Sequence, residues 1–114
     1  MLSNEINERL TRVGPGTPAG EMLRRYWQPI AAEAELTEET PKRKVRALCE
    51  DLVLFRDGRG NLGLIEEQCC HRSASLLYGF IEDDGLRCAY HGWKFDCSGE
   101  CIEMPFEDDD APKN

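Results

Sequence analysis

The fold of this chain is decided by two short stretches, CCH at residues 69–71 and CAYH at residues 88–91. Together they give the spacing Cys-x-His, sixteen residues, Cys-x-x-His, and they contain both histidines of the protein. Cysteine thiolates and imidazoles are ligands that iron and zinc both accept. The pattern therefore predicts a metal centre whose ligands are Cys69, His71, Cys88 and His91.

Two kinds of centre use two cysteines and two histidines. In a Rieske [2Fe–2S] cluster the cysteines hold one iron and the histidines the other, so each loop must supply one ligand of each type. A structural zinc site needs the same residues, but typical zinc loops pair cysteine with cysteine and histidine with histidine. Because each stretch here mixes the two types, we favour the binuclear cluster. The ordinary alternative is that each of these residues is simply a core or surface residue. It would have to hold at all four positions at once.

The segment before these stretches predicts a helical lead-in over residues 1–28. Residues 2–12 carry mixed charges and sparse apolar positions, and Gly14-Pro15-Gly16 then breaks the pattern. Thr17-Pro18 is typical of a helix N-cap followed by proline in the first turn. We expect that helix to reach about Tyr26. One face of this helix should pack on a sheet. Four apolar residues form that face: Met22, Leu23, Tyr26 and Trp27.

Short strands with frequent turns follow from Lys44 onward, which predicts a small antiparallel sandwich. Expected strands cover residues 44–49, 52–55, 62–65, 86–88, 93–96 and 101–104. Cys49 should be a buried residue of the first strand. A tight hairpin around Ser98-Gly99 should pair Cys97 with Glu100, a register that disfavours a disulfide to Cys101.

Composition limits the function classes. The chain has 114 residues, with 14 basic and 22 acidic side chains and a net charge of −8. This argues against nucleic-acid binding and against docking on an anionic membrane. There is no long apolar run and no signal-peptide pattern, so we expect a cytoplasmic protein with no membrane association. In that compartment six cysteines indicate metal or redox chemistry rather than disulfides.

Residues 68–105 resemble the Rieske domain of the aromatic ring-hydroxylating oxygenases, in their α subunit. The resemblance rests on CCHRSASL at 69–76 and CAYHGWKFD at 88–96. The segments GPGTP at 14–18 and RYWQP at 25–29 are similar to the lead-in of the phthalate-dioxygenase-like group. The resemblance implies an all-β, Rieske-type sandwich with one short N-terminal helix. We expect the domain at residues 29–106, its cluster-binding subdomain at about 66–104, and a solvated acidic tail at 107–114.

The family also implies partners. A flavin-dependent reductase or a ferredoxin donates electrons, and the acceptor is a mononuclear iron in an oxygenase catalytic domain, usually of a neighbouring subunit in a homotrimer. That iron is held by two histidines and a carboxylate, and this chain has no histidine left for it. We therefore predict the electron-transfer domain of a ring-hydroxylating dioxygenase or monooxygenase, lacking the catalytic site itself. The alternatives are a stand-alone Rieske ferredoxin and a zinc-stabilised interaction domain.

Five positions refine the prediction. Cys70 replaces the proline usual in the family, and we expect a free thiol beside the cluster. Respiratory Rieske proteins carry a disulfide at the positions of Ala74 and Tyr90, and hydroxyl donors at those of Trp93 and Phe95. With fewer donors toward the cluster, we predict a reduction potential on the order of −150 mV. Trp93 and Tyr90 should shield the cluster from water.

Overall fold

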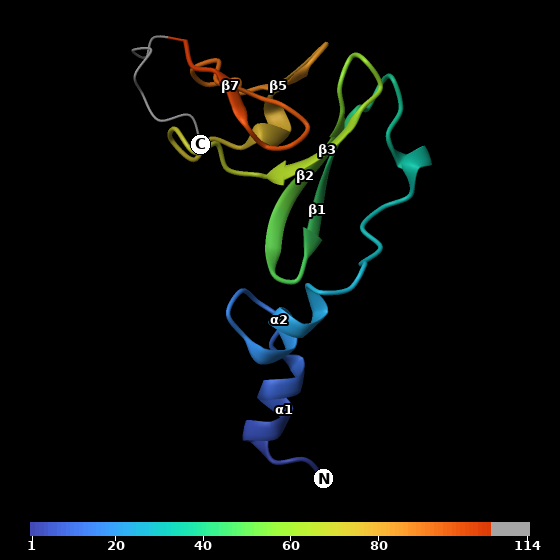
Figure 1. Cartoon of the computed structure of the whole chain (residues 1–114), viewed down its shortest axis with the longest axis vertical. Coiled ribbons are helices and arrows are strands. Elements are labelled where there is room, and N and C mark those ends of the chain that lie inside the picture. The colour runs from blue at the N-terminus through green and yellow to red at the C-terminus, as the bar shows by residue number, and fades with distance from the viewer. Residues whose placement is uncertain (106–114) are drawn as a thin grey trace.

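The computed structural model describes residues 1–105 and consists of two short helices followed by two antiparallel sheets (Figure 1). The predicted acidic tail lies outside the described residues. The helices are α1 Asn4–Thr11 and α2 Pro18–Leu23, with 3-10 turns η1 Glu33–Glu35 and η2 Leu76–Tyr78. The strands are β1 Lys42–Ala47, β2 Glu50–Arg56, β3 Leu62–Glu66, β4 Phe80–Glu82, β5 Gly85–Arg87, β6 Lys94–Phe95 and β7 Cys101–Glu103. No helix within this range is long and apolar enough to cross a membrane.

The first sheet has the order β1-β2-β3 and the second the order β4-β5-β6-β7. Alternate residues of β2 point into the core, where Val53 and Phe55 are fully buried. They pack in one apolar cluster with Leu86 of β5 and Cys101 of β7. The predicted all-β fold with two small antiparallel sheets is confirmed.

The tip of the β2–β3 hairpin joins the two sheets. The buried carboxylate of Asp57 accepts hydrogen bonds from the backbone N–H of Arg59 (3.0 Å) and of Asn61 (2.8 Å). It also accepts one from the thiol of Cys97 in the β6–β7 turn of the second sheet (3.4 Å). The N–H of Gly58 donates to the carbonyl of Glu82 at the end of β4 (2.9 Å). One turn of the first sheet is thus tied to two turns of the second.

The β1–β2 turn differs from the prediction. Cys49 is exposed and lies in the turn, whereas we expected it to be buried in a strand. Ala47 pairs with Glu50, so only Leu48 and Cys49 connect the strands, with φ of 48° and 65°. A two-residue hairpin turn matches the sheet twist when both central residues have positive φ. The twist therefore decides this turn, although neither residue has the usual preference for it.

Helix α2 begins as predicted and ends early. Thr17 Oγ1 accepts a hydrogen bond from the N–H of Gly20 (3.2 Å), which confirms the N-cap. The helix ends at Leu23 rather than near Tyr26. Arg24 then donates to the carbonyl of Leu48 (3.1 Å) and holds the helix beyond the end of the β1–β2 hairpin (Figure 1).

This placement overturns the predicted packing of the helix face. Met22 and Tyr26 are exposed, and Trp27 is completely exposed. The contact made by Arg24 lies at the hairpin turn, away from the face of the sheet, so these side chains have no sheet face to cover.

The β6–β7 hairpin is shifted by one residue from the predicted register. Phe95 pairs with Cys101, and the N–H of Asp96 donates to the carbonyl of Glu100 (2.9 Å). The Asp96 carboxylate accepts from the N–H groups of Ser98 (2.9 Å) and Glu100 (3.0 Å). These bonds favour a turn in which Asp96, rather than Cys97, faces Glu100.

Candidate metal centre

The first loop connects β3 to η2 and contains Cys69 and His71. The N–H of Cys69 donates to the carbonyl of Ala74 (2.8 Å), and the N–H of Ser73 donates back to the carbonyl of Cys69 (2.7 Å). Ser73 adopts a positive φ of 59°. These bonds curl the backbone into a closed loop that begins at Cys69.

The second loop, between β5 and β6, repeats this pattern. The N–H of Cys88 donates to the carbonyl of Trp93 (2.7 Å), and the N–H of Gly92 donates to the carbonyl of Cys88 (3.2 Å). Gly92 has a φ of 79° and corresponds to Ser73. Each cysteine is therefore the first residue of the same hydrogen-bonded loop.

The two cysteines form the sulfur end of the site. Both are buried, Cys69 with 2% and Cys88 with 3% of its surface exposed. Burial, together with the nearby sulfur of Cys88, raises the pKa of Cys69 to about 11. Two thiols this close and this deep would ionise readily only with a positive charge beside them, which a bound metal would supply.

The two histidines form the nitrogen end. Their ring centroids lie 4.8 Å apart, and the rings meet edge to face. Among the described residues, His91 Nδ1 is one of two buried side-chain polar atoms without a hydrogen-bond partner. A buried polar atom left unpaired destabilises a protein by about 1–3 kcal/mol. A metal bound at that nitrogen would remove this penalty, so the residues present fit the predicted group.

The donors are paired by type. Between residues 1 and 105 no three His, Cys, Asp or Glu side chains gather as a site for a single metal ion. The four predicted residues instead give one pair of thiols and one pair of rings, each pair drawing one member from each loop. This is the division that a binuclear cluster with mixed ligands requires.

Aromatic rings flank the nitrogen end. Trp93 is buried and stacks on His71, with ring centroids 4.3 Å apart and planes within 9° of parallel. Tyr90 contacts the ring of His91 (3.9 Å between centroids) but leaves most of its own surface exposed. Trp93 is thus placed to shield this end, and Tyr90 is less enclosed than we expected.

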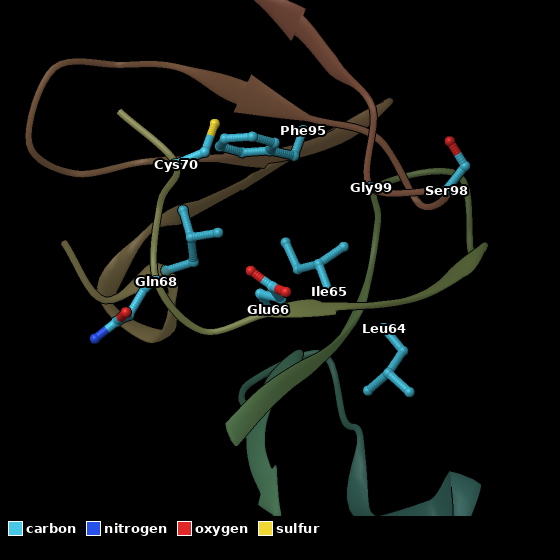
Figure 2. Close-up of a pocket in the computed structure, with 9 residues that line it drawn as sticks. Leu64, Ile65, Glu66, Gln68, Cys70, Phe95, Ser98 and Gly99 are labelled. Carbon is cyan, nitrogen blue, oxygen red and sulfur yellow. The ribbon is translucent and has the colours of Figure 1, made fainter. Parts of the chain in front are cut away.

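Cys70 lies apart from the two buried thiols. Its side chain is exposed and lines a shallow cleft of about 290 Å³ between the first loop and the β6–β7 hairpin (Figure 2). Phe95 and Glu66 line the same cleft. None of the six cysteines, which all lie within residues 1–105, forms a disulfide. Cys69, and not its neighbour, therefore occupies the position equivalent to Cys88.

A network of charges behind the second loop was missed by sequence reasoning. Lys94 is buried, yet its ammonium group contacts the carboxylates of Asp84 (2.8 Å) and Glu103 (3.1 Å). Arg87 pairs with Glu103 and also with Glu82. These cations lower the pKa of all three carboxyl groups. The one available signal was the position of Lys94 between two aromatic residues, Trp93 and Phe95.

Comparison with known proteins agrees with this geometry. Residues 26–111 match the family model described as the Rieske [2Fe–2S] domain. The chain is 57% identical over 113 residues to the 5,5'-dehydrodivanillate O-demethylase oxygenase subunit of Sphingobium sp., an alignment covering 99% of this chain and 26% of that protein. It is 48% identical over 109 residues to the phthalate 4,5-dioxygenase oxygenase subunit of Pseudomonas putida, covering 94% and 25%.

A solved structure gives the same picture. The structure of Pseudomonas putida CBB5 NdmA is 34% identical, with a TM-score of 0.66, and the match covers 75% of this chain and 27% of that one. The chain thus spans about a quarter of the length of the relatives it matches. The match to oxygenase subunits involves their N-terminal region.

Proposed function

Because this chain belongs to the Rieske [2Fe–2S] domain family, we propose that it transfers single electrons through such a cluster. Its ligands are the four residues predicted from the spacing: Cys69, His71, Cys88 and His91. The observation that carries the assignment is the pairing of two buried thiols and two rings, drawn from two loops with the same backbone hydrogen bonds.

Each part of the chain has a defined task in this proposal. The buried thiols of Cys69 and Cys88 would hold one iron and the ring nitrogens of the histidines the other, with His91 contributing its buried Nδ1. The bound cluster supplies a one-electron carrier whose potential is raised by its two neutral imidazole ligands. Trp93 keeps one face of His71 away from water.

The relatives suggest where the electron comes from and where it goes. They are oxygenase subunits about four times as long as this chain, so we infer that it acts as the N-terminal domain of a ring-hydroxylating oxygenase. A flavin-dependent reductase or a ferredoxin would supply the electron. The acceptor would be a mononuclear iron in a catalytic domain whose two histidine ligands this chain does not contain.

Iron and acid-labile sulfide per chain test the proposal directly. We expect about two of each after anaerobic reconstitution, a coloured protein, and an EPR signal on reduction. Cys69→Ser and His91→Ala should each abolish that signal. Cys49→Ser, at an exposed thiol in the β1–β2 turn, should leave it unchanged. A colourless wild-type protein with zinc at these residues would overturn the proposal.

A further inference from the structure

We propose that Arg87 is the positioning residue of the second ligand loop, which it orients through the carbonyl group of Gly92. This inference rests on the proposed function, since it concerns the geometry of a ligand loop. Arg87 is the last residue of β5 and directly precedes Cys88. Its Nη1 donates a hydrogen bond to the carbonyl of Gly92 (2.6 Å), which belongs to the peptide group between Gly92 and Trp93.

The guanidinium group is itself held from two sides. Its Nε and Nη2 donate to both carboxylate oxygens of Glu82 on β4, the second of these bonds being 3.1 Å long. Nη2 also donates to Glu103 on β7. A planar guanidinium with three such bonds has little freedom to rotate. The donor that reaches Gly92 is thereby fixed by strands on either side of β5.

The loop packs over the arginine as well as bonding to it. A side chain carbon added at Gly92 would lie 3.9 Å from Arg87 Nη1 and 4.0 Å from its Cδ. Gly92 also has a positive φ, which glycine adopts at no steric cost. The same backbone freedom means that its peptide needs support to keep one orientation. The bond from Arg87 gives that support from outside the loop.

The rings of His91 and Trp93 flank Gly92 in the chain. His91 precedes it, and Trp93 follows it and stacks on His71 of the other loop. A rotation of the Gly92 carbonyl therefore turns the peptide that carries Trp93, the stacking partner of His71, and alters the backbone next to His91. Arg87 sets ligand orientation without touching the ligands themselves.

Lys94 belongs to the same charge network, but the positioning role falls to Arg87. It contacts the same carboxylates, Glu82 (3.7 Å) and Glu103 (3.1 Å), and balances their charge within the network. Arg87 is the cation of this network that contributes the bond to the ligand loop. A lysine at position 87 would keep the charge but lose the fork that binds both carboxylates and the carbonyl.

Pulsed EPR of the reduced, cluster-loaded chain tests this assignment, because nitrogen hyperfine couplings report the orientation of histidine rings. We expect Arg87→Gln to change these couplings and to release the cluster to a chelator about tenfold faster, as loss of a charge-assisted hydrogen bond implies. Arg87→Lys should lie between Arg87→Gln and wild type. The control, Arg46→Gln, breaks an exposed ion pair on the other sheet and should match wild type.

The outcomes separate the two proposals. Wild-type couplings and wild-type release in Arg87→Gln would overturn the positioning role, and so would an equal change in Arg46→Gln. If Arg87→Gln does not fold, Glu82→Ala decides, because it removes the carboxylate that binds both Nε and Nη2; wild-type couplings there would overturn the role. A wild-type chain that binds no iron–sulfur cluster would instead overturn the proposed function, and this inference with it.

Discussion

Truncation of Trp93 should damage the site and the core together, whereas truncation of the other tryptophan should damage neither. Trp93 is 8% exposed and belongs to the buried cluster between the two sheets, while Trp27 is completely exposed. The chain contains only these two tryptophans, so Trp27→Ala is a matched control for Trp93→Ala.

The magnitude follows from burial and from the ring contact. Replacing a buried aromatic ring by alanine destabilises a protein by about 3–5 kcal/mol, through lost transfer free energy and the cavity left behind. A domain of this size has a total stability of about 5–15 kcal/mol, so the loss is a large fraction of it. Trp27→Ala should change the free energy of unfolding by no more than about 0.5 kcal/mol.

Trp93→Phe separates the ring from its N–H group. Trp93 Nε1 has no hydrogen-bond partner among the described residues, so phenylalanine removes volume and no hydrogen bond of the protein. We expect a loss of roughly 1 kcal/mol, with the stack on His71 retained. Trp93→Phe should therefore hold the cluster nearly as well as wild type, and Trp93→Ala should lose it.

Urea unfolding followed by far-UV circular dichroism measures the stability, and iron per chain measures cluster retention. A free energy of unfolding for Trp93→Ala within about 0.5 kcal/mol of the wild-type value would contradict this prediction. An equal loss of unfolding free energy in Trp27→Ala and Trp93→Ala would also contradict it, because burial would then not decide the size of the effect.

Three further predictions concern sulfur, potential and pH. Cys70→Ala should keep the iron content of wild type, because its exposed thiol lies outside the buried pair; a colourless Cys70→Ala protein would contradict this placement. Protein-film voltammetry should give a potential on the order of −150 mV, since Trp93 and Phe95 offer no hydroxyl donors, and a clearly positive midpoint would refute it. Burial opposes ionisation of Asp57, but hydrogen bonds led by those from Asn61 hold its pKa below the ordinary value. Its contribution to stability is therefore complete above the ordinary carboxyl pKa and lost as the pH falls through the lower folded pKa. Asp57→Ala should remove that acid-dependent loss in urea titrations, and an unchanged pH profile would contradict it.

Much of the site could be predicted from the sequence because its chemistry is local. Close Cys/His spacing places one ligand of each type in a single loop, and the structure brings the two loops together as expected. The N-cap at Thr17 and the strands around Val53 also follow from local preferences. The assignment of these four side chains as iron ligands stays a prediction.

The elements that sequence reasoning missed are decided by contacts between distant segments. Helix α2 stops where Arg24 reaches the carbonyl of Leu48, 24 residues further along the chain. The turn at Cys49 obeys the twist of the sheet rather than residue preference. Arg87 and Lys94 would ordinarily be read as solvated side chains on short strands, and only the folded sheet gathers the carboxylates that hold them.

The two ends of the site depend on different parts of the fold. At the sulfur end, Cys69 and Cys88 are equivalent residues of two loops with the same hydrogen bonds, so the backbone alone determines their positions. The histidines are not equivalent, because one follows its cysteine by two residues and the other by three. Backbone symmetry therefore cannot align the two rings, and side-chain contacts must do so.

Trp93 stacks on one ring, and Arg87 holds the peptide next to the other. Trp93→Phe and Arg87→Gln should consequently alter the nitrogen couplings of a bound cluster while its cysteine ligation stays intact. Variants that open a loop backbone should instead disturb both ends at once.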